Sequence, residues 1–250
     1  QKLTASDGAA FDYFGSSSSI SGDVILVGAP SKSCCSGYDQ GAAYIFRSND
    51  GGATWPSNET QILTHNFYKS SQDYFGWSSS ISGDVALVGA RGVDISGKTS
   101  QGAAFIFRSS DGGATWPPIQ TQVLTASDGA ALDEFGYSSA ISGDVAVVGA
   151  KNAAIGSNSN QGAAYIFRSS DGGATWPPIQ TQKLTASDGA VNDFFGISSA
   201  ISGDVALAGA YNVNSGQGAA YIFKEVSSSS KSSSSKVDDD DNTELTYSCS

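Results

Sequence analysis

The chain has 250 residues, enough for one large all-β domain or two smaller domains. Acidic residues outnumber basic residues by 24 to 13, and the formal net charge of -11 repels phosphate backbones and anionic lipid surfaces. No run approaches the roughly 18 apolar residues that a membrane-crossing helix needs. We therefore expect neither a nucleic-acid partner nor membrane insertion.

The N-terminal end gives a further expectation about location. The chain starts at Gln1 and contains no methionine. We interpret Gln1 as the end left after removal of a secretory signal, with a fragment boundary as the alternative. This interpretation predicts an extracellular protein, either secreted or attached to a cell surface.

Four copies of one unit follow each other along the chain. They start with "QKLT", "QILT", "QVLT" and "QKLT" at Gln1, Gln61, Gln122 and Gln182, so the period is 60 or 61 residues. Each copy then contains "FG", "ISGDV", an apolar run ending in "GA", a polar loop, and "QGAAYIF" or a close variant. Repeats of this length are typical of propellers and other arrays in which each unit packs on the next.

The repeats predict strands throughout. The apolar runs at 24–29 and 145–150 are rich in β-branched residues, as in strands covered on both faces. The "AAYIFRS" segments alternate and predict half-buried strands nearer an edge. The glycine of each "ISGD" is expected in a tight turn, where a positive φ costs glycine little. We predict four blades of four strands, in repeats of about 1–60, 61–121, 122–181 and 182–224.

An eight-residue segment, S-x-D-G-G-A-T-W, occurs three times between the "YIFRS" strand and the strand that follows. It is expected to form the hairpin loop joining them. Its aspartate can accept hydrogen bonds from backbone N–H groups, and its tryptophan can cover the turn. We interpret it as a structural staple made by Asp50 with Trp55, Asp111 with Trp116, and Asp171 with Trp176.

Two resemblances follow from these motifs. The "FG" pairs, together with "VGAP" at Val27 to Pro30, resemble the FG-GAP repeats of integrin-α-type β-propellers. The eight-residue hairpin is similar to the Asp-box of sialidases and other propellers. Together the resemblances cover residues 1 to about 224 and imply a β-propeller. They leave function open, because propellers serve adhesion, binding and catalysis alike.

Closure of the ring is expected at the N-terminus. The fourth repeat stops at "YIFKEV" without a fourth strand, and "QKLT" at residues 1–4 has no blade of its own. We therefore predict that this N-terminal strand closes the last blade and removes the open sheet edges. The alternative is a partial array that other chains complete.

The loops that hold calcium in integrin-type repeats are poor in carboxylates here. The first two loops offer only Asp39 and Asp94, whereas Ca²⁺ takes several oxygen ligands. The "SDGAxxD" pattern pairs further aspartates, which we interpret as acceptors for turn N–H groups. Its members are Asp7 with Asp12, Asp128 with Asp133, and Asp188 with Asp193; repeat two retains only Asp73. We expect no cofactor and no metal, with Ca²⁺ as the alternative.

Catalysis is not expected. Sialidase-like enzymes hold a sugar carboxylate with several arginines, but Arg47, Arg108 and Arg168 occupy one repeat position on successive blades. The only histidine, His65, has no obvious partner in the sequence and is expected on the surface or in packing. Nucleophile-elbow and phosphate-loop motifs do not occur. A sialidase-like hydrolase remains the weakest functional alternative.

The tail, residues 225–250, changes to serine, aspartate and lysine and has too few apolar side chains for a core. It could reach up to about 85 Å when extended. Its end, "LTYSCS", is expected to add as a strand to a neighbouring propeller. Cys249 would then form a disulfide with Cys34 or Cys35, whereas unpaired cysteines are the alternative.

Sugar attachment fits the same location. Asn58 lies in the triplet "NET", an N-glycosylation sequon, and serine runs in secreted proteins often carry O-linked sugars. The candidate serines are Ser227, Ser228, Ser229, Ser230, Ser232, Ser233, Ser234 and Ser235. The run Asp238 to Asp241 is interpreted as a solvated spacer, with calcium bridging or docking to a basic surface as alternatives.

These observations favour a secreted, non-catalytic structural protein. Its propeller would be a building block, and its tail would link copies into a fibre or surface layer. The alternative is an adhesin or lectin that binds a surface protein or glycan on one propeller face.

Overall fold

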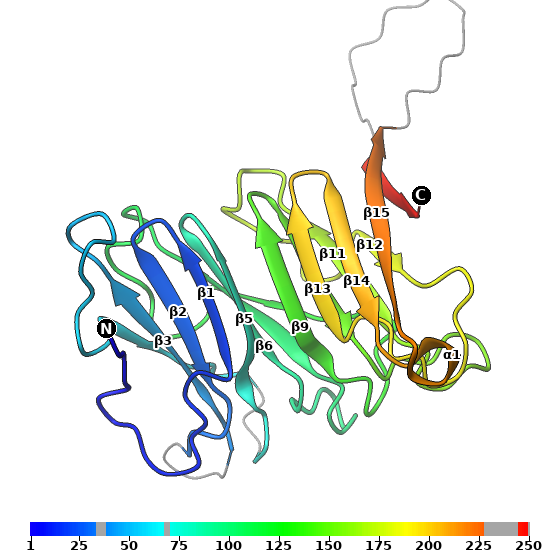
Figure 1. Ribbon diagram of the computed structural model, residues 1–250, viewed down its shortest axis with the longest axis horizontal. Helices are drawn as coiled ribbons and strands as arrows, with labels where there is room; N and C mark the ends of the chain where they lie inside the picture. The colour runs from blue at the N-terminus through cyan, green and yellow to red at the C-terminus, as the bar shows by residue number, and fades with distance from the viewer. Residues whose placement is uncertain (34–38, 68–70, 228–244, 250) are drawn as a thin grey trace, which may run out of the picture.

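The computed structural model describes residues 1–33, 39–67, 71–227 and 245–249, which form four antiparallel sheets of four strands each (Figure 1). We call the sheets blades 1 to 4 in chain order. Blades 1 and 2 contain β1 (Ser17–Ser21), β2 (Val24–Ala29), β3 (Ala42–Arg47) and β4 (Gln61–Leu63), then β5 (Phe75–Ser82), β6 (Val85–Ala90), β7 (Ala103–Arg108) and β8 (Gln122–Leu124). Blades 3 and 4 contain β9 (Phe135–Ser142), β10 (Val145–Ala150), β11 (Ala163–Arg168) and β12 (Gln182–Leu184), then β13 (Ser198–Ser202), β14 (Val205–Ala210), β15 (Ala219–Ser227) and β16 (Leu245–Cys249). The predicted all-β architecture of four four-stranded blades is confirmed; a short helical turn, α1 (Val213–Gly216), precedes β15.

The "ISGD" turns join the first two strands of each blade. In blade 1, Ser21 faces Val24 across the turn between β1 and β2. The turn glycines have φ values of 57°, 54°, 57° and 55° at Gly22, Gly83, Gly143 and Gly203. This left-handed geometry is the one predicted for these positions, and it sets the same register in all four blades.

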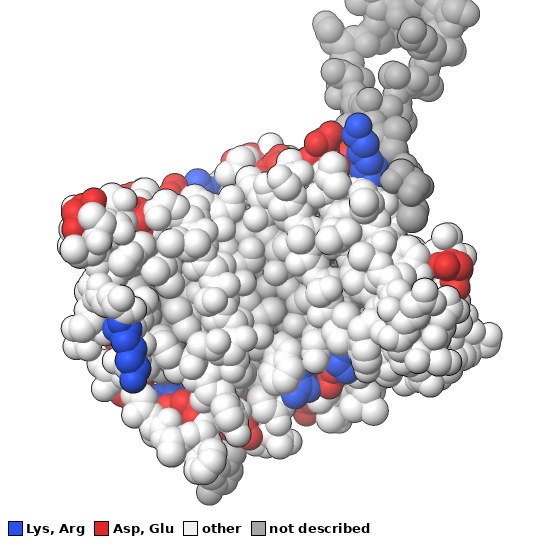
Figure 2. Space-filling model, viewed as in Figure 1, with Lys and Arg blue, Asp and Glu red and all other residues white. Residues whose placement is uncertain are grey.

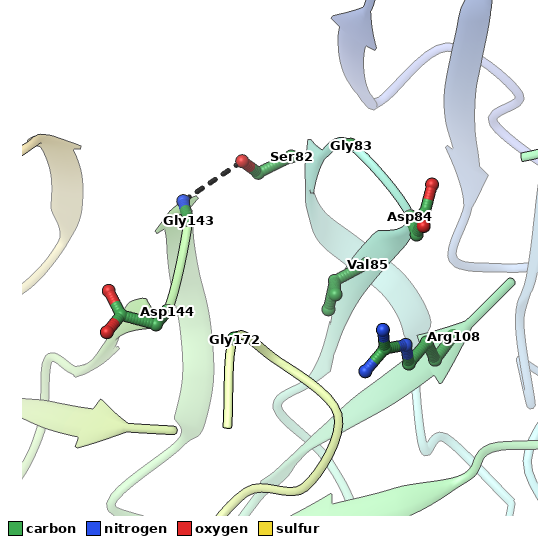
Figure 3. Close-up of a pocket in the computed structure, with 8 residues that line it drawn as sticks. All are labelled: Ser82, Gly83, Asp84, Val85, Arg108, Gly143, Asp144 and Gly172. Carbon is green, nitrogen blue, oxygen red and sulfur yellow. Dashed lines mark hydrogen bonds between the residues drawn. The ribbon is translucent and has the colours of Figure 1, made fainter. Parts of the chain in front are cut away.

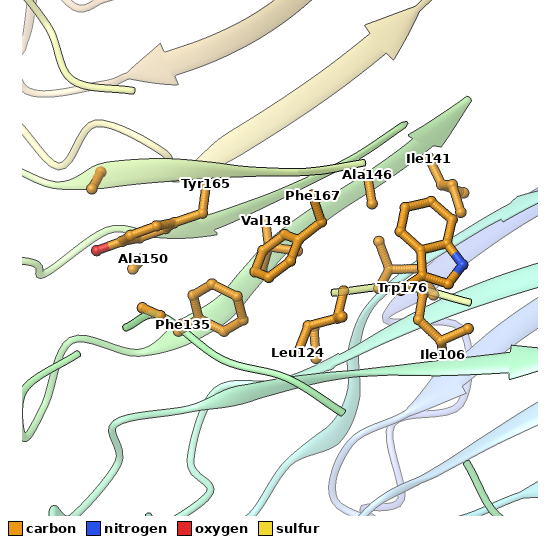
Figure 4. Packing of buried hydrophobic residues seen from close by; sticks show 14 of the residues in the cluster. Ile106, Leu124, Phe135, Ile141, Ala146, Val148, Ala150, Tyr165, Phe167 and Trp176 are labelled. Carbon is orange, nitrogen blue, oxygen red and sulfur yellow. The ribbon is translucent and has the colours of Figure 1, made fainter. Parts of the chain in front are cut away.

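Each blade has two apolar faces because side chains alternate along a strand. In β6, Val85 and Leu87 pack on blade 3, whereas Ala86 and Val88 pack on blade 1. We call the face toward the next blade the leading face and the face toward the preceding blade the trailing face. Figure 4 shows the core between blades 2 and 3, in which Phe135 and Trp176 lie among side chains of both blades. Stacking of blades therefore supplies the hydrophobic core.

The "FG" pair is a point of close approach between blades. The backbone N–H of Phe75 in blade 2 donates to the carbonyl of Gln40 in blade 1, at 2.9 Å. At Gly76 a Cβ would lie 2.4 Å from the carbonyl oxygen of Ala42, so any side chain there would force the blades apart. The "FG" motif is thus an interblade contact of the fold.

The row of blades is open, which corrects the expected closure. Among the described residues, three apolar cores join blade 1 to 2, 2 to 3 and 3 to 4, and none joins blade 4 to blade 1. Figure 1 places β1 and β15 toward opposite sides of the molecule. The open row agrees with the alternative of a partial array, whose completion by other chains stays a prediction.

The two chain ends also differ from expectation. The N-terminal segment lies against blade 1: Gln1 Nε2 donates to the carbonyl of Trp55 at 2.5 Å, and Leu3 packs on the trailing face of that blade. The fourth strand of blade 4 is β16, which pairs with β15 of the same chain. The prediction that the tail strand adds to a neighbouring propeller is therefore wrong for this strand, because β15 runs on to Ser227 and offers it an edge.

Candidate functional site

The three aspartate hairpins are closed by their own side chains. In the second hairpin, Asp111 accepts hydrogen bonds from the backbone N–H and the hydroxyl of Thr115, at 2.8 and 2.7 Å. Ser109 Oγ donates to the same carboxylate at 2.7 Å and accepts from the N–H of Gly113 at 2.8 Å. The other two hairpins repeat these bonds around Asp50 and Asp171.

These hydrogen bonds change the acidity of the carboxylates. Hydrogen bonds from the neighbouring threonine and serine lower the pKa of Asp50, Asp111 and Asp171 from 3.8 to about 2. The charged form accepts the bonds, so it is favoured. The hydrogen bonds found for these aspartates all come from groups of the same turn, which supports a structural role for them.

The hairpin tryptophans cover the junctions between blades. Trp116 and Trp176 are 4% and 3% exposed, and each belongs to the core shared with the preceding blade. Their indole N–H groups donate to the carbonyls of Gly113 and Gly173 at 3.1 Å. Trp55 occupies the same position in blade 1 and is only half-buried, since no other blade of the described residues packs against it.

The "SDGAxxD" aspartates bind protein groups. Asp133 accepts the backbone N–H of Ala130 at 2.7 Å, while Asp128 accepts the hydroxyl of Tyr165 at 3.1 Å and pairs with Lys183 at 2.6 Å. Asp12 and Asp193 accept the corresponding backbone N–H groups of Ala9 and Ala190, at 2.8 and 2.7 Å. Burial raises the pKa of Asp133 above its ordinary value. These bonds fix the loop that leads into the "FG" pair in repeats 1, 3 and 4.

Repeat two contains a buried pair that the sequence did not reveal. His65 Nε2 lies 3.3 Å from Asp73 Oδ2, and the two side chains are 3% and 0% exposed. The ring of His65 also packs against Phe75 and Phe105, with centroids 5.4 and 4.8 Å away. The packing interpretation of this histidine is confirmed, but its partner comes from a loop whose pairing could be seen only in three dimensions.

The repeated arginines lie on separate blades. Arg47 pairs with Asp23 at 3.4 Å, and Arg168 pairs with Glu225 at 2.5 Å. Arg108 lines a hollow of about 460 Å³ between blades 2 and 3, together with Asp84 and Asp144 (Figure 3). Its Nη1 atom is buried and has no hydrogen-bond partner in the described part of the chain. Two of the three arginines thus neutralise acids close to them.

Metal ligands do not gather in the described residues, where no group of three His, Cys, Asp or Glu side chains is placed to hold an ion. Of the two loop carboxylates, Asp94 accepts the N–H of Ser100 at 2.7 Å. Asp39 has a left-handed backbone, with φ of 57°. Within the same residues, no helix has the length and apolarity to span a membrane.

A group of aromatic and charged side chains follows the ends of β6 and β10. The guanidinium of Arg91 lies 3.9 Å from the ring centroid of Trp77, and Lys151 lies 4.7 Å from that of Tyr137. Glu134 binds both cations at 2.7 Å. We call the set the aromatic–cation band; its members are Tyr74, Trp77, Arg91, Glu134, Tyr137, Lys151, Phe194 and Tyr211.

The aromatic–cation band differs in charge from the face formed by the first strand of each blade. Figure 2 shows charged side chains along the rims of this face, whereas its centre, over β1, β5, β9 and β13, is uncharged. Serine occurs in each of these strands, as in "SSSIS" of β1 and "FGWSSSIS" of β5. The centre thus offers hydroxyl and apolar groups to any ligand, and charge is confined to the edges.

The leading face of blade 4 is the largest departure from the repeat pattern. Val205, Leu207 and Ile222 are 37%, 38% and 50% exposed. Their counterparts in the other three blades are at most 5% exposed: Val24, Val85 and Val145; Leu26, Leu87 and Val147; Ile45, Ile106 and Ile166. These three side chains also line an apolar hollow of about 270 Å³. A face built for packing is therefore open to solvent.

Sequence comparison identifies the repeats. The model of the FG-GAP repeat matches four times, at residues 1–46, 69–107, 118–167 and 178–223, and these matches cover more than half of the chain. The chain belongs to the FG-GAP repeat family. A comparison with functionally characterised proteins gives no match.

The FG-GAP motif has a clear structural meaning in this chain. Its "FG" pair touches the preceding blade, and its "GA" ends the second strand at a residue of at most 1% exposure, at Ala29, Ala90, Ala150 and Ala210. The position after "GA" holds Pro30, Arg91, Lys151 and Tyr211, and two of these carry the cations of the aromatic–cation band. The variable position of the FG-GAP repeat is thus where this chain places distinctive chemistry.

Several expected sites lie outside the described residues. These are Cys34, Cys35, Ser228 to Ser235 and Asp238 to Asp241. Cys249 is part of β16, whose backbone pairing alone is described, so a disulfide with Cys34 or Cys35 stays a prediction. Asn58 is exposed in the loop before β4, and its glycosylation likewise stays a prediction.

Proposed function

We propose that the protein is a non-catalytic structural module of the extracellular space, which works by joining other proteins through the open end of its blade row. The exposed leading face of blade 4 carries this proposal, because the same residues are buried between blades elsewhere. Fully burying a valine, leucine or isoleucine side chain contributes about 1.5–3 kcal/mol. An apolar face of this kind on a protein surface is typical of an interaction site.

Two further parts of the proposal, the extracellular location and a role without catalysis, have their own support. FG-GAP repeats are typical of extracellular proteins, and the serine-rich tail and the Asn58 sequon suit a secreted chain. Most of the titratable side chains described above are engaged in turns, ion pairs and packing, with the buried Nη1 of Arg108 as the exception. We therefore retain a structural role and place the assembly contact on the blade ends. A linking role for the tail and its Cys249 would come in addition.

The proposal is tested by the mass of the protein in its natural source. We expect native mass spectrometry of gently extracted material to find the 25.5 kDa chain inside a larger complex. The same sample, run with and without reductant, separates a non-covalent complex from one linked through Cys249. A free, single chain in the source material would contradict the proposal.

A second candidate, an adhesin that binds glycans, is favoured by the aromatic–cation band. Stacked aromatic rings with a nearby cation, such as Trp77 with Arg91, are suited to sugars that carry a carboxylate or sulfate. A glycan array tests it. Binding that is lost in Trp77→Ala, but kept in Arg47→Ala on another edge, would support an adhesin, whereas a blank array would remove it.

A further inference from the structure

Each junction between neighbouring blades uses the same polar contacts. First, a phenylalanine N–H donates to a glutamine carbonyl at 2.8–2.9 Å: Phe75 to Gln40, Phe135 to Gln101, and Phe195 to Gln161. Second, a serine hydroxyl of the earlier blade donates to a glycine carbonyl at 2.8–2.9 Å: Ser17 to Gly76, Ser78 to Gly136, and Ser138 to Gly196. Third, a glycine N–H donates to a serine hydroxyl of the earlier blade at 3.0–3.3 Å: Gly83 to Ser21, Gly143 to Ser82, and Gly203 to Ser142.

Blade 4 carries one half of a fourth such junction. The residues that repeat the roles of the earlier blade are Gln217, Ser198 and Ser202, and all three are exposed. They border the exposed leading face formed by Val205, Leu207 and Ile222. The leading face of blade 4 therefore carries the groups that would bind another FG-GAP blade.

Blade 1 carries the other half. Gly15 and Gly22 hold the positions that receive a preceding blade, and Ile20 on the same face is 62% exposed. The counterparts of Ile20, which are Ile81 and Ile141, are 6% and 7% exposed because a blade covers them. The half-buried Trp55 shows the same lack of a neighbour. The trailing face of blade 1 can therefore pack against the leading face of another blade.

The N-terminal segment fits the edge of blade 4 in sequence and in register. In blade 3, "QKL" of β12 pairs with "AAYIF" of β11, with Leu184 opposite Ala164 and Gln182 opposite Ile166. Blade 4 has the identical "AAYIF" at residues 219–223. Apart from β12 itself, the sequence "QKL" occurs only at residues 1–3. The tail strand β16 pairs from Phe223 onward and so lies beyond the stretch that β12 covers in blade 3.

Charge completes the match. In blade 3, Lys183 pairs with Asp128 at 2.6 Å and lies 5.4 Å from the ring centroid of Tyr165. In blade 4, Asp188 already accepts the hydroxyl of Tyr221 at 2.8 Å, and Asp188 is exposed. Lys2, in the "QKL" of residues 1–3, is the residue that repeats Lys183. An N-terminal "QKL" docked on blade 4 would bring Lys2 to Asp188.

We propose that the leading face of blade 4 binds blade 1 of a second copy of this chain, with residues 1–3 of that copy added beside β15. This inference rests on the proposed function and names its partner. A contact between unlike surfaces closes into a ring when the rotation allows it. Two copies supply eight blades, the upper end of the usual range for closed propellers, and each copy then completes the other.

Cross-linking between two different chains tests the proposal. In a background with Cys34, Cys35 and Cys249 changed to serine, one chain carries Gln1→Cys and the other carries Ile222→Cys. Facing residues of antiparallel strands have Cα atoms about 4.5–5.5 Å apart, which a disulfide can bridge. After mixing and mild oxidation, we expect a species of twice the 25.5 kDa chain mass that contains both variants. Ile179→Cys, at an equally exposed position within the row, replaces Ile222→Cys as the control and should give no such species.

A second test places a charge on the leading face of blade 4. Leu207→Asp in the Ile222→Cys chain should reduce the cross-linked yield at least tenfold without unfolding the chain, because Leu207 is already 38% exposed. Leu132→Asp, at a loop residue that is 61% exposed, should leave the yield unchanged. Circular dichroism of both variants verifies that they are folded.

Two results would overturn the inference. One is the absence of the mixed species. The other comes from a single chain that carries both Gln1→Cys and Ile222→Cys: if the cross-link forms only within such a chain, its own N-terminus occupies the edge of blade 4. If the mixed species is absent while the natural material is still a larger complex, the proposed function survives with a different partner. A free single chain in the natural material contradicts the proposed function itself.

Discussion

The leading faces of blades 2 and 4 have nearly the same sequence and opposite surroundings. Val85 and Leu87 are 5% and 0% exposed, whereas Val205 and Leu207 are 37% and 38% exposed. Both pairs lie in the second strand of a blade, in the same register with the strands on each side. The difference therefore arises from the presence or absence of a next blade. In a repeat protein each unit contributes stability mainly through its neighbours.

The comparison is tested most strongly at the hairpin tryptophans. Trp116→Ala empties a core between two blades, and we expect it to lower the free energy of unfolding by about 3–5 kcal/mol. Trp55→Ala removes a half-buried ring at the open end and should cost about 1–2 kcal/mol. Urea unfolding at sub-micromolar concentration, where copies are separate, measures both. Equal losses would contradict the interblade role of the ring.

The leucine pair gives the next effect. Leu87→Ala should cost about 2–5 kcal/mol because it leaves a cavity between blades 2 and 3. Leu207→Ala should cost less than about 1 kcal/mol under the same dilute conditions, since its side chain already contacts water. The same unfolding experiment, repeated at high protein concentration, should raise the cost of Leu207→Ala alone. A concentration-independent result for this variant would argue that its face has no partner.

The serine contacts sharpen the comparison at smaller scale. Ser78 Oγ donates to the carbonyl of Gly136 at 2.9 Å, so Ser78→Ala should cost about 1 kcal/mol. Ser198→Ala, at the matching position of blade 4, should change the stability of the separate chain by less than the error of the measurement. A loss of similar size at both positions would show that the bond between blades does not account for the effect.

We expect the three aspartate hairpins to contribute to stability with the same pH dependence in blades 1, 2 and 3. Their aspartates have a folded pKa of about 2, below the ordinary value of 3.8, so their stabilising contribution is complete above pH 4. It is lost as the pH falls from about 4 to about 2, since protonation removes the charged acceptor. Urea midpoints at pH 5, 3 and 2 should fall less steeply in Asp111→Asn than in the parent chain. An equal fall would mean that this carboxylate is not the group that titrates.

Much of a single blade could be predicted from the sequence because local rules determine it. The β-branched runs, the "ISGD" turns and the fourfold period fix strand order and register within a repeat. The "FG" pair was visible as a motif, although its role as a contact between blades was not. That role depends on a backbone approach at Gly76 that only the stacked arrangement shows.

The ends of the row could not be predicted in the same way. The N-terminal "QKLT" has the sequence of a fourth strand, but the residues around it do not determine which blade it joins. The structure places it beside Trp55, while β16 from the tail pairs with β15 from Phe223 to Ser227. The pairing of His65 with Asp73 was missed for a different reason, because His65 stands where the other repeats have alanine and no repeated pattern marks it as a partner of Asp73.

The most direct test of the account is the mass of the unmodified chain in solution. Sedimentation equilibrium over a range from below one to about one hundred micromolar reports whether the open ends find each other. The account predicts a reversible change from the 25.5 kDa chain to twice that mass as concentration rises. A single 25.5 kDa species across the whole range would contradict it, because the exposed face of blade 4 would then remain uncovered by a second copy.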